Sequence, residues 1–438
     1  MINQNTFLSK VKALLFRNFS NMSQDSRNIM LFTFEGVLIT LVNNMINNNN
    51  NLFATRLGAT DFQVSLVTSL PQFVGILVLI PGGILTDRML NKRKMVIISL
   101  MCLTAAYIAI GFVPEMGKYR YFAFLILLSL SAGPMTMYNA TWQAYFSDVV
   151  PLESMNRTYS VRIKGTFLIS IIAPVFTGLL LASASSNSGK IRFHQSFFWA
   201  AGLLLIFQIL VLKRITGGNV KSHEGIRFKD LIKTASGLAH NKRFMGFIGV
   251  ALFFYMTWHT DWTLYFIGQV KYLKMNEAWL GYVNVGGALV QFLTISFWSR
   301  INEKTGVRFP IILGSLGLAL CPMAMIIGTS IKSGMGATVF LILNTIFNFA
   351  YATVMLNILQ CLIQVIPQVN KTLSISIYNA LVTLSNAVMP IVGVQIYAAF
   401  GSDRKALQLT FLIVFTARII ATGLWALRWW RHRKEIDW

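Results

Sequence analysis

Two carboxylates stand inside long apolar stretches of this chain, where acidic side chains are rare. Glu35 lies in the run 28–55, and Asp261 lies in the run 244–268. Removal from water favours the protonated form of a carboxylate, so either group could load and release a proton as its exposure changes. His259 could share this task, because imidazole changes charge near neutral pH. Two structural roles stay open: a hydrogen-bond partner of a neighbouring helix for Glu35, and a solvated charge in an outer vestibule for Asp261.

Amide and aromatic side chains accompany these carboxylates in four of the apolar runs. Asn344, Asn348 and Tyr351 are spaced four and three apart, which puts all three on one face of a helix. Amides donate and accept hydrogen bonds, which suits a neutral polar or zwitterionic ligand. Aromatic residues at this spacing also serve as packing or interface anchors, and the Asn run 47–51 could be an uncoiled helix end. The candidate site residues are Glu35, Asn43, Asn44, Asn47, Tyr138, Asn139, Trp142, Gln143, Trp258, His259, Asp261, Asn344, Asn348 and Tyr351.

The elements that carry these residues are long enough to cross a membrane. The chain is 55% hydrophobic and only 12% charged, far from the composition of a soluble domain, with a mean hydropathy of +0.59. Runs of about 20 apolar residues suit helices rather than the shorter strands of a barrel. We therefore predict an all-α integral membrane protein with twelve transmembrane helices, at 28–55, 62–85, 95–113, 121–146, 159–183, 194–213, 244–268, 278–299, 309–328, 336–364, 373–400 and 406–429.

The basic residues are distributed unequally between the two sides of these spans. With the N-terminus inside, 27 of the 38 Lys and Arg face the cytoplasm, 10 face the opposite side, and Arg418 falls in the last span. This bias predicts that both termini are cytoplasmic. The net charge of +23 then reflects topology and attraction to anionic lipids rather than nucleic acid. Short loops favour the plasma membrane of a bacterium.

The spans fall into two groups of six, separated by a basic, polar linker. We divide the chain into a cytoplasmic N-terminal segment with an interfacial helix, a six-helix bundle, a linker with an amphipathic helix, a second six-helix bundle and a basic tail. Their ranges are 1–27, 28–213, 214–243, 244–430 and 431–438. The three cysteines lie in predicted spans as packing residues. No motif for an enzyme, a metal or a cofactor appears, and we expect a monomer.

The two groups of six are related by an internal repeat with an offset of 216 residues. Asp61 corresponds to Glu277, Pro174 corresponds to Pro390, and the acid of the loop after the second span corresponds to Glu303. These matches occur in order and on the same predicted sides of the membrane. They indicate two homologous halves in the same orientation.

The stretch GGILTDRMLNKRKM, residues 82–95, resembles the signature loop of the major facilitator superfamily (MFS). The resemblance covers nearly the whole chain, with Leu90 in place of the usual Gly. It implies that Gly83 and Asp87 pack against the eleventh helix near Thr372 and latch a cytoplasmic gate. The motif and its copy in the second half comprise Gly83, Asp87, Arg88, Lys92, Arg93, Glu303, Lys304 and Arg308.

The resemblance implies a secondary active transporter that moves a small solute by alternating access, and the intramembrane carboxylates favour coupling to protons, with sodium as an alternative. No buried base is evident on a cavity-lining span, because Arg418 falls on the peripheral twelfth helix. Neutral, cationic or amphipathic cargo is therefore favoured. We lean to export; import of a nutrient or metabolite stays open, as does a non-transporting sensor or lipid-handling protein.

Overall fold

The computed structural model describes residues 23–89, 91–150, 152–217, 228–331, 334–366 and 371–433. Nearly all of these residues are helical, and none of them forms a strand. The fold expected from the sequence is thus confirmed. The interfacial helix expected before residue 28 and most of the basic tail lie outside the described residues.

The first half of the chain forms six spans, of which the first is divided. It comprises α2 (Gln24–Ile46), η1 (Asn47–Asn49), α3 (Asn50–Arg56), α4 (Asp61–Arg88), α5 (Lys92–Gly111), η2 (Val113–Tyr119), α6 (Arg120–Val149), α7 (Leu152–Ser183) and α8 (Asn187–Lys213). Helix α9 (Phe228–His240) follows in the linker.

The second half repeats this order with more interruptions. It comprises α10 (Lys242–His259), α11 (Trp262–Ile267), η3 (Gly268–Tyr272), α12 (Glu277–Thr305), α13 (Arg308–Ala319), α14 (Cys321–Ser330), α15 (Gly336–Phe347), η4 (Asn348–Ala350), α16 (Tyr351–Val365), α17 (Lys371–Ala399) and α18 (Arg404–His432). The breaks between α10 and α11 and between α15 and α16 fall within the seventh and tenth spans.

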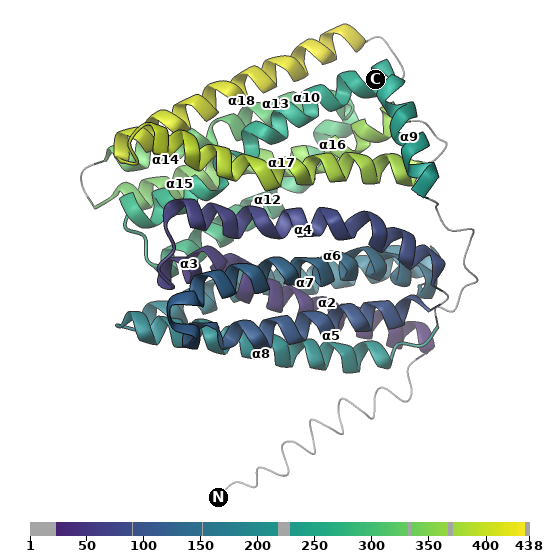
Figure 1. The fold of residues 1–438 in the computed structure, drawn as a ribbon. Helices are drawn as coiled ribbons and strands as arrows, with labels where there is room; N and C mark the ends of the chain where they lie inside the picture. The colour runs from purple at the N-terminus through teal and green to yellow at the C-terminus, as the bar shows by residue number, and fades with distance from the viewer. Residues whose placement is uncertain are drawn as a thin grey trace, which may run out of the picture.

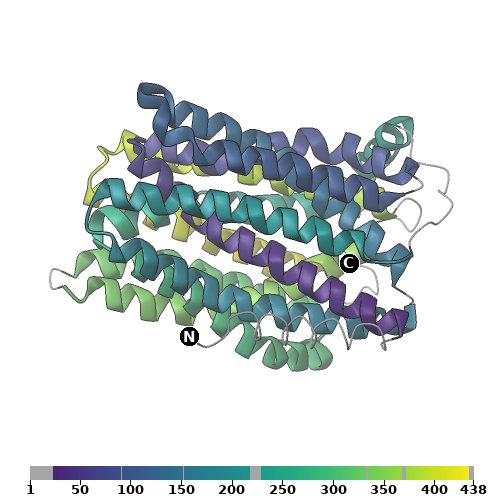
Figure 2. The same ribbon diagram turned by 90° about the horizontal axis from the view of Figure 1, so that it is seen from below.

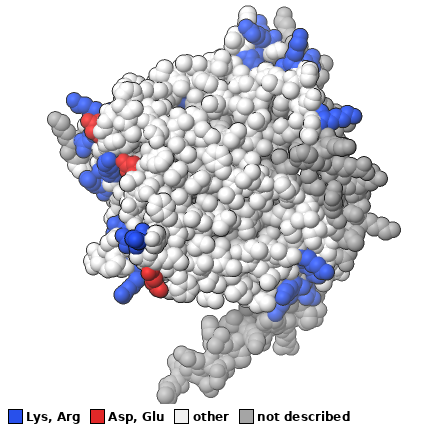
Figure 3. All heavy atoms as spheres, viewed as in Figure 1, with Lys and Arg blue, Asp and Glu red and all other residues white. Residues whose placement is uncertain are grey.

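Eleven of the twelve predicted spans are continuous enough to cross a membrane by length and composition among the described residues. The seventh span is the exception, because Thr260 and Asp261 separate α10 from α11. Lysine, arginine and the acids gather at the two ends of the face shown in Figure 3, and the band between them is free of charge. This band is the surface expected of a protein buried in lipid.

The two halves lie side by side, with α4 and α17 facing each other between them (Figure 1). Helix α7 packs along α12 in a second contact between the halves. Seen from below, the helices run lengthwise and α2 crosses them obliquely (Figure 2). We call the end of the bundle near α9 the linker end and the opposite end, where α12 begins, the Glu277 end.

Each half has its own apolar core, and the two halves repeat the same polar contacts. Thr86 and Thr141 share a hydrogen bond of 2.8 Å in the first half. The residues 216 positions later, Asn302 and Asn357, exchange two hydrogen bonds of 2.7 and 2.9 Å. Both pairs connect the second span of a half to its fourth, so the repeat seen in the sequence extends to buried packing.

Candidate functional site

Asp261 lies at the break in the seventh span, where the backbone leaves the helix. The amide of Thr260 still donates to Met256 O at 3.2 Å, and the amide of Tyr265 donates to Asp261 O at 2.8 Å to begin α11. The side chain of Asp261 is fully buried. Its Oδ1 accepts a hydrogen bond from Nη2 of Arg418 at 2.7 Å, whereas its Oδ2 has no partner. An unpartnered buried carboxylate oxygen is costly unless a proton or a ligand reaches it.

Arg418 is held in place by the backbone of two other helices as well as by Asp261. Its Nε donates to Thr257 O at 3.4 Å and its Nη1 donates to Leu318 O at 2.9 Å. Its Nη2 also donates to Trp258 O at 3.1 Å. The side chain is 2% exposed and points inward from α18. The prediction that no base is buried beside a cavity is therefore wrong.

Asp261 lines a cavity of about 210 Å³ where the broken seventh span faces the broken tenth span. Five residues that we predicted from the sequence meet there, from α10, α15, η4, α16 and the break itself. Arg418, Tyr265 and Gln269 are lining residues that we did not predict. The cavity is lined by Trp258, Asp261, Trp262, Tyr265, Gln269, Leu318, Cys321, Asn344, Asn348, Tyr351 and Arg418.

Aromatic rings form one side of this cavity. Trp258 and Tyr351 lie edge to face with ring centroids 5.4 Å apart. His259 is buried behind them, where its ring meets that of Trp262 at 4.7 Å and its Nδ1 lies 3.1 Å from Oγ of Ser385 on α17. His259 does not line either cavity described here, although it supports the ring of Trp262.

A larger cavity of about 540 Å³ lies mainly in the first half. Its polar lining includes Asn47, Asn139 and Gln72, of which Gln72 was not predicted. Trp262 lines this cavity as well as the smaller one. The indole of Trp262 therefore forms a wall shared by the cavities of the two halves.

Glu35 occupies a closed polar cage within the first half. Its Oε1 accepts hydrogen bonds from the hydroxyl of Tyr138 and from Nε2 of Gln208, the latter at 2.8 Å. Its Oε2 accepts from Nε1 of Trp142 at 3.1 Å and from Nη2 of Arg162 at 3.4 Å. Glu35 is fully buried and lines neither of the cavities described above. Three residues predicted from the sequence therefore lie together, namely Glu35, Tyr138 and Trp142. None of them lines the Asp261 cavity.

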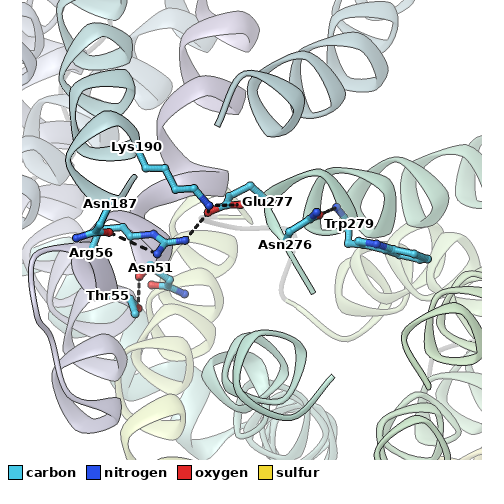
Figure 4. A network of polar contacts seen from close by, with 8 residues as sticks. All are labelled: Asn51, Thr55, Arg56, Asn187, Lys190, Asn276, Glu277 and Trp279. Atoms are coloured by element: carbon cyan, nitrogen blue, oxygen red, sulfur yellow. Dashed lines mark hydrogen bonds and ion pairs between the residues drawn. The ribbon is translucent and has the colours of Figure 1, made fainter. Parts of the chain in front are cut away.

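A second polar cluster connects the two halves at the Glu277 end (Figure 4). The carboxylate of Glu277 binds Arg56 and also accepts hydrogen bonds from Nζ of Lys190 at 2.8 and 3.0 Å. Both bases belong to the first half, and Glu277 begins α12 of the second. Asp61, the repeat equivalent of Glu277, pairs with Lys271 at 3.2 Å. Three ion pairs therefore close this end.

The described members of the predicted gate motif lie at the linker end. Lys92 forms an ion pair with Asp148 at 2.8 Å. In the second half, Nε of Arg308 donates to Oε1 of Gln364 at 3.1 Å, which is the repeat equivalent of that contact. Nη1 of Arg93 donates to Ile215 O at 2.7 Å. Glu303 and Lys304 are exposed. The burial of Gly83 and the side chains of Asp87 and Arg88 lie outside what the structure describes.

Three remaining candidates on the first and fourth spans line neither cavity. Nδ2 of Asn44 donates to Thr40 O at 2.8 Å, within its own helix. Oδ1 of Asn43 is buried without a partner, and Gln143 is exposed.

Comparisons with known proteins agree on one family. A family model described as the Major Facilitator Superfamily matches residues 32–389. No curated protein matches the sequence. The fold is similar to a bacterial homolog of the human lysosomal transporter Spinster, at 14% identity and a TM-score of 0.69, over 93% of this chain and 97% of that one. It is also similar to a POT family transporter in complex with 5-aminolevulinic acid, at 13% identity and a TM-score of 0.72, over 93% and 97%. A D-xylose-proton symporter is similar at 12% identity and a TM-score of 0.67, over 91% of this chain and 96% of that one.

Proposed function

The chain belongs to the Major Facilitator Superfamily and is a multi-pass secondary transporter of that kind, and we propose that it couples the movement of a small organic solute to protons through Asp261. The proposal rests on a difference in hydrogen bonding between the two oxygens of this carboxylate. One oxygen is fixed by Arg418, and the other is unpartnered in the wall of a cavity. A carboxylate in this state can bind a proton or a ligand without breaking the contact that positions it.

The environment of Glu35 supports a structural role instead. Four donors occupy its two oxygens, and they come from α6, α7 and α8. A carboxylate with this many donors has no free oxygen for a ligand. We propose that Glu35 fixes α2 to its neighbours and does not carry the coupling proton.

The ion pairs at the Glu277 end support alternating access. Glu277 and Asp61 each bind a base of the opposite half, so separation of the halves at this end requires that these pairs break. The excess of basic residues at the linker end favours a cytoplasmic position for that end. We propose that the structure is closed toward the outside, and that opening moves the first half away from the second.

The test is proton movement in liposomes that contain the purified protein and a pH-sensitive dye. A proton gradient is imposed, and pools of lipophilic cations, peptides, sugars and amino acids are added in turn. The proposal predicts that at least one compound drives proton movement. Glu35→Gln is run beside the parent and is expected to retain this movement in the fraction that folds.

Two results would contradict the proposal. Binding of compounds without flux would indicate a sensor on the same scaffold. Solute flux that follows a sodium gradient and leaves the dye unchanged would show that sodium is the coupling ion.

A further inference from the structure

We propose that the cargo carries a protonated amine, which binds Oδ2 of Asp261 in place of the coupling proton, so that one organic cation is exchanged for one proton. This inference rests on the proposed function and adds to it the class of the cargo and the direction of coupling. Three features of the smaller cavity support it: the unpartnered oxygen of Asp261, the aromatic lining and the net charge.

The cavity presents an unpartnered acceptor at Asp261. Oδ2 of Asp261 is buried, unpartnered and part of the cavity wall. Nδ2 of Asn348 donates one of its two N–H groups to Asn344 O at 2.8 Å. Four of the five N–H groups of Arg418 have partners, three of which are backbone carbonyls. An ionised carboxylate oxygen only accepts hydrogen bonds, so Oδ2 of Asp261 requires a ligand group that donates one.

The aromatic walls favour a cation among such donors. Trp258, Trp262, Tyr265 and Tyr351 line the same small cavity as Asp261. The faces of such rings attract an ammonium group, and the attraction is stronger when water is excluded. A carboxylate oxygen beside four aromatic side chains is thus suited to an amine with an apolar body.

The charge of the cavity supports exchange. With Arg418 charged and Asp261 ionised, the empty cavity is neutral. A bound monovalent cation gives the same total charge as a proton on Asp261, so the two loaded forms are electrically equivalent. An anionic cargo would instead depend on Arg418, whose guanidinium is largely occupied by fixed carbonyls.

Asp261 is the sole acid among the residues described as lining the cavity. The other charged or titratable groups around the cavity are Arg418 on α18, Tyr265 on α11, Cys321 on α14, Tyr351 on α16 and His259 at the end of α10. The proton that the amine displaces therefore belongs to Asp261.

Calorimetry on the full-length protein in detergent tests this proposal with three matched probes. Phenethylamine is the cation, 2-phenylethanol is the neutral isostere and 3-phenylpropionate is the anion. Titrations in two buffers with different heats of ionisation report both the affinity and the number of protons released. We expect phenethylamine to bind with release of up to one proton, and its affinity to rise about tenfold per pH unit in the acidic range. The affinity of 2-phenylethanol should not depend on pH.

Asp261→Asn keeps the size of the side chain and removes its charge. It is expected to weaken phenethylamine binding by about tenfold or more and to abolish proton release. Glu115→Gln is the matched control, because Glu115 is an exposed acid in η2. Proton release by the parent protein needs no variant, so the test holds even if Asp261→Asn folds poorly.

Two outcomes would overturn the inference. One is equal affinity for the amine and the alcohol without proton release. The other is binding of 3-phenylpropionate with proton uptake, which would indicate symport of an anion through Arg418. In either case, proton movement with another cargo in the liposome screen would leave the proposed function standing.

Discussion

Asp61 and Glu277 begin equivalent helices in the two halves, and each carboxylate binds a base of the opposite half. Their burial differs, since the side chain of Asp61 is 38% exposed and that of Glu277 is 3% exposed. Glu277 also binds two bases, Arg56 and Lys190, whereas Asp61 binds Lys271. Glu277 therefore contributes more than Asp61 to closing the Glu277 end.

We predict that Glu277→Gln opens the Glu277 end. Removal of one partner of a buried ion pair costs about 3–5 kcal/mol, because the remaining charges stay desolvated. A cysteine placed at Asn51, which lines the larger cavity, should react at least about tenfold faster with an impermeant thiol reagent from that side. The labelling is done in vesicles with Cys102 replaced by Ser.

Asp61→Asn is the control for this change. An exposed ion pair contributes less than about 1 kcal/mol, so the labelling rate should change less than about fivefold. Equal effects of the two substitutions would show that burial of Glu277 does not determine closure.

Gly281→Ala should also open the Glu277 end. A Cβ at Gly281 would lie 2.7 Å from the carbonyl oxygen of Pro174 on α7, and backbone cannot move aside as a side chain can. Helices α7 and α12 must separate to accept the methyl group. Faster labelling at Asn51 is expected, whereas Gly423→Ala, which meets nothing within 4 Å, should leave the rate unchanged.

Glu35→Gln should destabilise the fold without loss of proton coupling. The amide cannot balance the charge of Arg162, whose guanidinium lies 4.0 Å above the ring of Trp142. We expect a cost of about 3 kcal/mol or more, measured as a lower temperature of unfolding in detergent. Unchanged stability, or loss of proton coupling in the fraction that folds, would contradict the structural role of Glu35.

Trp262→Ala should weaken cargo binding with little change in stability. Trp262 is 39% exposed and forms the wall between the two cavities. Loss of its ring should raise the KM for a cationic cargo by about threefold to thirtyfold. Trp430→Ala is the matched control, because Trp430 is 60% exposed on α18. An effect of equal size at both positions would exclude a specific role for Trp262.

The sequence predicts the spans because their length and apolar composition are set by the bilayer. The offset of 216 residues between the halves is also visible, since Asp61 and Glu277 keep their order and side. The break at Asp261 is not visible, because an apolar run does not reveal where backbone hydrogen bonds are interrupted. This break is what brings Asp261 into the cavity wall.

The sequence does not show which side of each helix faces the protein interior. Lipid and protein interior are both apolar, so the pattern around Arg418 does not reveal that α18 turns this residue inward. Gln208 could have been found, because a polar residue inside an apolar run was the criterion that identified Glu35. The contact between Gln208 and Glu35 could not have been found, since it joins residues 173 positions apart.

The most direct test of the role of Asp261 compares two kinds of transport by Asp261→Asn in liposomes, with a cargo identified in the screen. At a cargo concentration that saturates the weakened site, we predict that exchange of labelled for unlabelled cargo continues, while accumulation driven by a proton gradient is lost. Accumulation at the parent level by Asp261→Asn would contradict the assignment of Asp261 as the coupling carboxylate.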